Sequence, residues 1–152
     1  MQETAIYLLK GLGPLMFGAS ATEAKAAFGD PAETEELFDE LLNEKSLVYH
    51  YWDHGFSLFF KDDETKTFTC AEVDDDAVVL FGKKVFDLDE KEIIALFKEN
   101  GYALTETEQH TWGERRLSFD EAFADLYFEK GKLISINFCV SDYPSQIKVN
   151  LN

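Results

Sequence analysis

Basic residues are scarce in this sequence. Its 152 residues include 14 Lys and Arg against 30 Asp and Glu, which gives a formal net charge of −16 at pH 7. Binding to nucleic acid or to an anionic membrane depends on Lys and Arg side chains that neutralise phosphate, so neither is expected as a partner. The charge favours a cationic partner instead, although solubility alone is the other explanation for it.

Long apolar runs are missing as well. The first one, residues 6–9, is far too short for a membrane span or for the apolar core of a secretory signal. Residues 1–4 contain no basic side chain, which such a signal also needs. We therefore expect a cytoplasmic protein without membrane association.

Cysteine is almost absent. Cys70 and Cys139 lie in apolar, strand-like segments and have no CxxC spacing. In a reducing compartment this pattern predicts two buried free thiols, and neither a disulfide nor a metal site.

Catalytic motifs are also lacking. The chain contains no Gly-x-Ser-x-Gly, no P-loop and no HExxH, and its Ser, Cys and His residues show no local pairing that would activate a nucleophile. His50 and His54 have the spacing of a metal pair on a helix, but residues 47–52 alternate as in a strand, where the two would lie about 13 Å apart. The sequence thus predicts a protein that is not an enzyme and has no cofactor and no metal.

Three glycines stand in the segment GLGPLMFGAS, residues 11–20. A dinucleotide-binding loop needs Gly-x-Gly-x-x-Gly, but Met16 occupies the third glycine position and Pro14 lacks a backbone donor. We interpret the segment as a corner between a strand and a helix, with Phe17 and its counterpart Phe86 directed into the core.

An internal repeat is the strongest positive signal. Residues 13–28 align with residues 82–97 at a constant offset of 69, and Ser20 then falls on Asp89. Each of these residues is followed three positions later by a Glu, which forms a capping box and predicts helices at 20–28 and 89–100.

Strand-like segments follow each helix. Residues 56–73 and 124–140 each hold two runs rich in aromatic and β-branched residues around a polar turn, as in a hairpin. The remaining segments with a predicted structure are strands at 47–52, 77–81, 115–119 and 146–151 and a helix at 33–45.

Together these elements predict a single α+β domain over residues 1–152. Aromatic residues make up 14% of the chain and hydrophobic residues 45%, enough for a substantial core. We expect two tandem helix-plus-β-meander repeats, about 5–81 and 82–152, that form one antiparallel sheet. Both helices would pack on one face, and the other face would be partly open.

The segments GPLMFGASATEAKAAFGDP, VVLFGKKVFDLDEKEIIALFKENGY and LYFEKGKLISINF resemble small bacterial immunity proteins of polymorphic toxin and contact-dependent inhibition systems. The layout is also similar to that of beta-lactamase inhibitor protein and of the small lipoprotein of the outer-membrane assembly machine. The chain differs from the former in having no signal peptide and no paired disulfide cysteines, and from the latter in having no lipidated N-terminal Cys. The resemblance implies a cytoplasmic protein that neutralises a cationic toxin by tight stoichiometric binding.

Binding to a basic protein requires acidic groups for encounter and a few aromatic anchors for affinity. Two clusters contain both kinds of group: Tyr51, Trp52, Asp53 and His54 form one, and Trp112 and Glu114 form the other. A third cluster, Asp74, Asp75 and Asp76, is purely acidic. Core packing of the tryptophans and a solvated turn at the aspartates are the structural alternatives. A small-ligand or housekeeping binding domain and a degraded enzyme remain the alternative functions.

Overall fold

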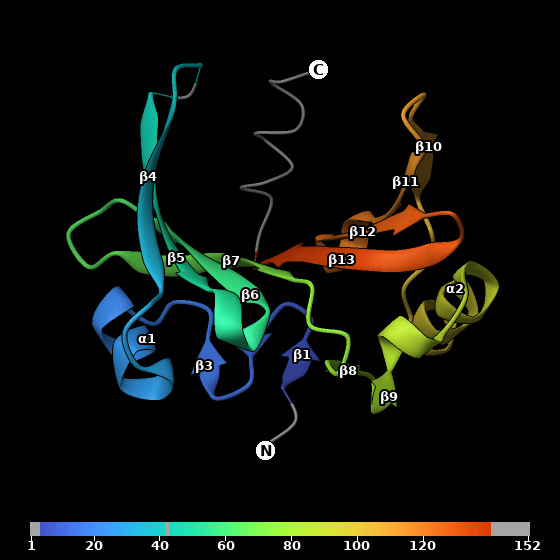
Figure 1. Cartoon of the computed structure of the whole chain (residues 1–152), viewed down its shortest axis with the longest axis horizontal. Helices are drawn as coiled ribbons and strands as arrows, with labels where there is room; N and C mark the ends of the chain where they lie inside the picture. The colour runs from blue at the N-terminus through green and yellow to red at the C-terminus, as the bar shows by residue number, and fades with distance from the viewer. Residues whose placement is uncertain (1–3, 42, 141–152) are drawn as a thin grey trace.

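The computed structural model describes residues 4–41 and 43–140, which form an α+β fold made mostly of strands (Figure 1). Two α-helices, α1 (Ala21–Phe28) and α2 (Glu90–Glu99), and two sheets make up this part of the chain. The predicted fold class is therefore confirmed at the level of α+β.

The larger sheet has eight strands, and all of its neighbouring strands are antiparallel. In spatial order the strands are β10 (Glu106–Gln109), β11 (Glu114–Phe119), β12 (Ala124–Glu129), β13 (Lys132–Cys139), β7 (Thr67–Val73), β6 (Phe56–Lys61), β5 (Glu44–Tyr51) and β4 (Glu33–Asp39). Strands β4 to β7 follow α1 in the chain, and β10 to β13 follow α2. The two groups of four strands meet at the β7–β13 pair.

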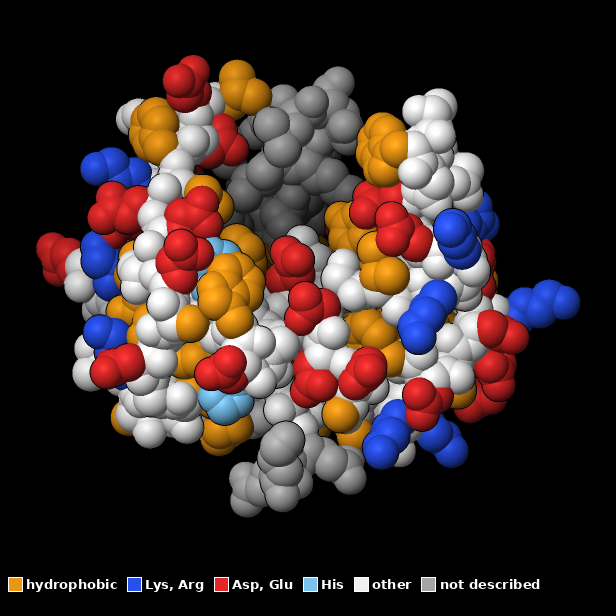
Figure 2. Space-filling model, in the orientation of Figure 1, with side chains coloured by type: hydrophobic (Ala, Val, Ile, Leu, Met, Phe, Trp, Pro, Cys, Tyr) orange, Lys and Arg blue, Asp and Glu red, His pale blue; other side chains and the backbone are white. Residues whose placement is uncertain are grey.

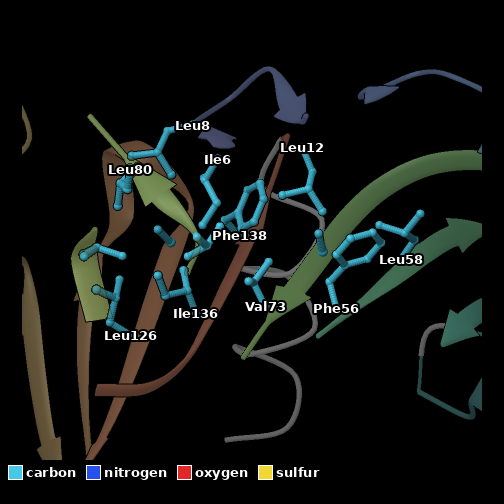
Figure 3. Close-up of a cluster of buried hydrophobic side chains, with 14 of the residues drawn as sticks. Ile6, Leu8, Leu12, Phe56, Leu58, Val73, Leu80, Leu126, Ile136 and Phe138 are labelled. Atoms are coloured by element: carbon cyan, nitrogen blue, oxygen red, sulfur yellow. The ribbon is translucent and has the colours of Figure 1, made fainter. Parts of the chain in front are cut away.

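The prediction of one sheet was wrong. A second sheet has the order β3 (Leu15–Met16), β2 (Gly11–Leu12), β1 (Ala5–Tyr7), β8 (Val79–Leu80) and β9 (Lys83–Lys84). Its β1 and β8 are parallel, which joins two segments more than 70 residues apart in the chain. These short strands form a separate sheet because their apolar residues, such as Leu12 and Leu80, are buried against the larger sheet (Figure 3).

The glycine-containing corner forms the β2–β3 hairpin of this second sheet. A Cβ atom on Gly11 would lie 2.2 Å from the carbonyl oxygen of Leu15, so only glycine permits the close approach of the two strands. Phe17 packs against Phe68 with 4.8 Å between ring centroids, and Phe86 is buried, so both side chains are directed into the core as the sequence predicts.

Both helices begin with the predicted capping boxes. The Ser20 hydroxyl accepts a hydrogen bond from the Glu23 backbone N–H at 3.1 Å, and the Asp89 carboxylate accepts one from the Glu92 N–H at 2.9 Å. In each case the Glu side chain returns a bond to the N-cap backbone. Each box satisfies two donors that the first helical turn would otherwise leave unpaired.

The helices and the smaller sheet lie on the same side of the eight-stranded sheet (Figure 1). The core fills the space between the layers, with Phe56, Leu58 and Phe138 contributed by the larger sheet (Figure 3). Phe97 of α2 stacks on Phe119 of β11 at 3.9 Å between ring centroids. We call the opposite side of the larger sheet its outer face.

The predicted helix at 33–45 is absent from the described part of this segment, which instead forms the β4–β5 hairpin. Leu37, Phe38 and Leu41 have helix-like spacing but remain exposed, so the described residues of this segment bury no apolar stripe. Pairing of β4 with β5 satisfies the backbone hydrogen bonds, and no apolar side chain of β4 has to be buried for this. The strand conformation puts the adjacent Leu37 and Phe38 on opposite faces.

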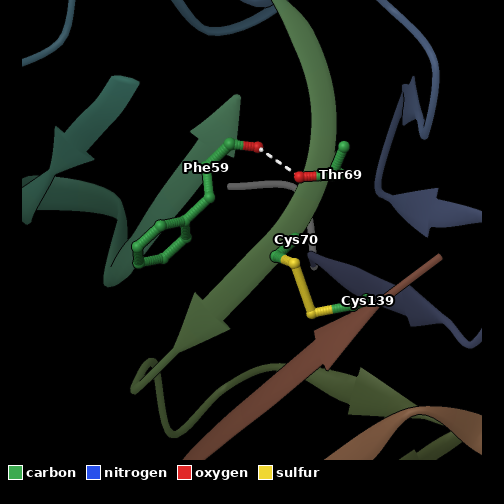
Figure 4. Close-up of a disulfide and its surroundings, with 4 residues drawn as sticks. All are labelled: Phe59, Thr69, Cys70 and Cys139. Atoms are coloured by element: carbon green, nitrogen blue, oxygen red, sulfur yellow. Dashed lines mark hydrogen bonds between the residues drawn. A yellow bond between two sulfur atoms is a disulfide. The ribbon is translucent and has the colours of Figure 1, made fainter. Parts of the chain in front are cut away.

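The prediction of free thiols was also wrong, since Cys70 of β7 and Cys139 of β13 form a disulfide (Figure 4). The two residues are direct partners in the antiparallel register, with Cα atoms 4.1 Å apart. Spacing along the chain did not reveal the pair because the two strands become neighbours only in the folded sheet.

The strand expected at 146–151 lies outside the described residues. Within residues 4–41 and 43–140, neither helix has the length and apolar character that a membrane crossing requires.

Candidate functional site

A row of polar residues crosses the outer face of the eight-stranded sheet. Directly paired residues of neighbouring strands point to the same side of a sheet, and the registers connect one residue from every strand. From β4 to β10 these residues are Glu33, His50, Ser57, Glu72, Asn137, Asp125, Ser118 and Glu106. None of them is apolar, whereas the opposite face carries the core.

In the first half of the row, His50 connects two neighbours. Its Nδ1 lies 2.7 Å from the Ser57 hydroxyl, and its Nε2 lies 2.9 Å from a carboxylate oxygen of Glu35. The indole of Trp52 stacks on the imidazole at 4.3 Å with an interplanar angle of 11°. Trp52 remains 57% exposed, so it covers His50 and still presents an aromatic face to solvent.

Glu72 follows Ser57 in the same row. Its side chain is open to solvent, and among the described residues no donor or cation forms a hydrogen bond or ion pair with it. Partial removal of water by the surrounding protein raises the pKa of the Glu72 carboxyl, and the nearby Asp74 charge raises it further, while His50 acts in the opposite direction. The attraction of His50 is thus too weak to offset the loss of water and the repulsion from Asp74 at the Glu72 carboxylate.

Gly55 brings two of the predicted clusters together. Its carbonyl oxygen accepts hydrogen bonds from the backbone N–H groups of Asp74 at 2.9 Å and Asp75 at 3.1 Å. Gly55 has a φ of 74°, and a Cβ there would lie 2.6 Å from the Asp75 Cβ. The turn that contains Asp74, Asp75 and Asp76 is thus placed directly beside the short 3-10 helix η1 (Trp52–His54).

The second half of the row is organised around a buried guanidinium. Arg116 of β11 pairs with Glu106 at 2.7 Å and Glu108 at 3.4 Å, and it also contacts Asp125 at 3.7 Å. It donates a further hydrogen bond to the Ser118 hydroxyl. The three carboxylates around Arg116 therefore share one cation within the chain, whereas Glu72 has no cation partner among the described residues.

The cluster predicted around Trp112 lies apart from the one around Trp52. Trp112 stands in the β10–β11 turn, where it stacks on His110 at 4.2 Å and is 70% exposed. His110 lies 2.9 Å from Glu108. Glu114 begins β11 and is partly buried opposite Glu129. The β10–β11 and β4–β5 hairpins are at opposite ends of the sheet order (Figure 1).

The remaining predicted residues differ in exposure. Asp53 is exposed. His54 is exposed too, but its ring packs against Phe56 at 5.5 Å, on the core side of the sheet, whereas His50 faces outward. Tyr51 is buried and donates a hydrogen bond to the Gly29 carbonyl, and burial raises its pKa to about 12. We therefore leave Tyr51 out of the proposed surface.

Sequence reasoning missed Glu35, Ser57 and Glu72. A usable signal was present for two of them, because Ser57 and Glu72 each stand between apolar residues that face the core. Their strand neighbours indicate that these side chains point outward. The pairing of Glu35 with His50 depends on the β4–β5 hairpin, which was expected to be a helix.

The Glu35–His50–Ser57 chain has the order of groups found in serine hydrolases, but its surroundings suit binding better than acyl transfer. The cross-strand neighbour of Ser57 is the carboxylate-bearing Glu72, which would repel a developing oxyanion. Among the described residues, no group of three or more His, Cys, Asp and Glu could hold a metal ion. Figure 2 shows acidic, hydrophobic and histidine side chains adjacent to one another on the side of the molecule that carries β5 and β6.

No family model matches the sequence, and no curated protein does. Among solved structures, a DUF4309 family protein, YjgB from Bacillus subtilis, is similar at 14% identity and a TM-score of 0.42, over 78% of this chain and 76% of that one.

Proposed function

We propose that this protein binds a cationic protein on the outer face of its eight-stranded sheet and neutralises it by stoichiometric capture, as an immunity protein neutralises a toxin. The observation that supports the proposal is the row of polar residues across all eight strands, with exposed Trp52 beside it and a carboxylate, Glu72, that pairs with no cation among the described residues. A folded chain with a charge of −16 attracts such a partner over long range.

The ends of the two outer hairpins add apolar contacts to this surface. Leu37 lies on the same face of β4 as Glu33 and is exposed, Leu41 is exposed in the β4–β5 turn, and Trp112 is exposed in the β10–β11 turn. Exposed apolar and aromatic side chains supply binding energy when a partner removes them from water. A basic partner that spans both hairpins would meet carboxylates between two aromatic or aliphatic ends.

We also propose that the chain is a duplicated unit, with its two copies at about 5–81 and 82–152. The support is the offset of 69 residues that relates both the two capping boxes and the two disulfide cysteines. Duplication would produce two similar ends on one sheet and so a wide surface for a single partner.

The direct test uses the protein encoded by the reading frame next to this one. Purified separately, the two proteins are expected to form a 1:1 complex in size-exclusion chromatography with light scattering. Co-expression should restore growth to cells that the neighbouring protein inhibits. Association should slow markedly when salt is raised from about 0.05 M to about 0.5 M, because screening shortens the reach of the charges.

Two variants locate the surface in the same assay. Replacing both Trp52 and Glu72, as W52A/E72Q, should weaken the complex at least tenfold. Glu99→Gln removes one charge from an exposed position of α2 on the other side of the sheet and should leave affinity unchanged. Failure to form a complex, or equal weakening by both changes, would overturn the proposal.

A further inference from the structure

We infer that the space bordered by Trp52, Ser57 and Glu72 takes the guanidinium group of an arginine from the partner. This inference rests on the proposed function, because the arginine belongs to the captured protein. It names the side chain that the outer face recognises and the place where that side chain binds.

The argument begins with a difference between the two halves of the polar row. In the second half, Arg116 stands on β11 two residues before Ser118, and its guanidinium contacts Ser118, Glu106 and Asp125. In the first half, Val48 stands on β5 two residues before His50, and it carries no charge. The second half of the row therefore holds a guanidinium among its hydroxyl and carboxylate groups. The first half has a hydroxyl and a carboxylate, Ser57 and Glu72, but no arginine at the matching position of β5.

The groups of the first half are arranged around a small residue. His50, Ser57 and Glu72 are successive members of the row, so about 4.8 Å separates each strand from the next. Ser57 is much smaller than either neighbour, and its hydroxyl is held by His50 at 2.7 Å. Ser57 itself is buried at 9% exposure, so a side chain from a partner would contact the exposed Trp52 indole and the exposed Glu72 carboxylate on either side of it.

Arginine fits these groups better than other cations. Its planar guanidinium stacks on an indole, donates two parallel hydrogen bonds to one carboxylate and is less strongly hydrated than an ammonium group. Trp52 provides the exposed aromatic face, and Glu72 provides the carboxylate. A cation at this place would also offset the unfavourable proximity of Asp74 to Glu72.

The test uses three short peptides, acetyl-Gly-Arg-Gly-amide and its lysine and citrulline analogues, titrated into the full-length protein at about 0.15 M salt. The readout is the NMR signal of each tryptophan indole N–H. Trp112 is a matched reference, because it also stacks on a histidine and is also exposed. We expect the arginine peptide to shift the Trp52 signal with a dissociation constant on the order of 1–10 mM.

The lysine peptide should bind at least threefold more weakly, and the citrulline peptide, which keeps the shape without the charge, should not bind. Glu72→Gln should weaken the arginine peptide at least threefold, and Glu99→Gln should not. Equal shifts at Trp52 and Trp112, or binding of citrulline as strong as that of arginine, would overturn the inference.

The outcomes for the two proposals are separable. If the neighbouring protein is captured through this face but the arginine peptide does not bind, only the arginine site is refuted. If the neighbouring protein is not captured, the proposed function fails whatever the peptides do.

Discussion

Cys70 and Cys139 face each other at the centre of the eight-stranded sheet, where β7 of the first half pairs with β13 of the second. Their disulfide closes a loop of 69 residues and joins the two halves at their only strand-to-strand junction in the larger sheet, as far as the described residues extend. Disulfides persist mainly in oxidising compartments. The two cysteines therefore give no support to a cytoplasmic location, because they are not free thiols. The location remains a prediction.

Removal of this disulfide should lower the free energy of unfolding by about 2–4 kcal/mol, because the unfolded chain regains the entropy that the closed loop removes. Urea denaturation with and without a thiol reductant measures the change. The variant C70S/C139S should be as unstable as the reduced wild type in both conditions and should not respond to the reductant. Two titratable thiols in the unfolded, unreduced protein would show that the bond does not form.

Gly55→Ala should destabilise the protein by about 1–3 kcal/mol, because the new Cβ would meet the Asp75 Cβ at 2.6 Å and the backbone has a positive φ. Gly131→Ala is the matched control. Its φ is 80°, but nothing lies within 4 Å of the added Cβ, so only the backbone strain of about 1 kcal/mol is expected. If Gly55→Ala and Gly131→Ala lowered the stability equally in thermal or urea denaturation, the close contact at Gly55 would be contradicted.

Ser57→Ala should cost about 1 kcal/mol, because the His50 Nδ1 loses its partner at a partly buried place. The loss should also change the fluorescence of Trp52, since the indole stacks on the imidazole. Ser135→Ala on β13 removes a hydroxyl from the same sheet and should change neither stability nor fluorescence by a comparable amount. A silent Ser57→Ala variant would show that the Glu35–His50–Ser57 chain does not hold in solution.

Glu72→Gln should make the folded protein slightly more stable at pH 7. Folding raises the pKa of the Glu72 carboxyl, so the folded state holds the proton more tightly than the unfolded state. This tighter proton binding stabilises the folded protein at low pH. That effect is lost as pH rises through the folded pKa. The gain from the substitution should accordingly vanish below about pH 4, near the ordinary pKa of a glutamate.

Thermal denaturation of the wild type, Glu72→Gln and Glu99→Gln over this pH range provides the measurement. Glu99→Gln controls for the loss of one negative charge from an acidic protein. A destabilised Glu72→Gln variant at neutral pH would mean that the carboxylate has a stabilising partner in the folded chain. Such a partner would also weaken the case for an arginine site.

Local sequence was sufficient for the elements that depend on neighbouring residues. Ser20 and Asp89 each have their Glu three positions later, and these contacts form within one helical turn. The hairpins at 56–73 and 124–140 follow similarly from β-rich runs around polar turns. The segment 33–45 was predicted wrongly because its apolar spacing suits a helix, while pairing with β5 decides its conformation.

The sequence alone therefore determined the acidic charge, the α+β composition and the starts of both helices, since these need only composition or contacts a few residues apart. Only the tertiary structure decided the disulfide, the second sheet and the polar row across the outer face. Each of these depends on which strands become neighbours, and the contact between β7 and β13 joins residues that are 69 positions apart. Strand pairing at that distance is set by the packing of the whole core, and no local pattern specifies it.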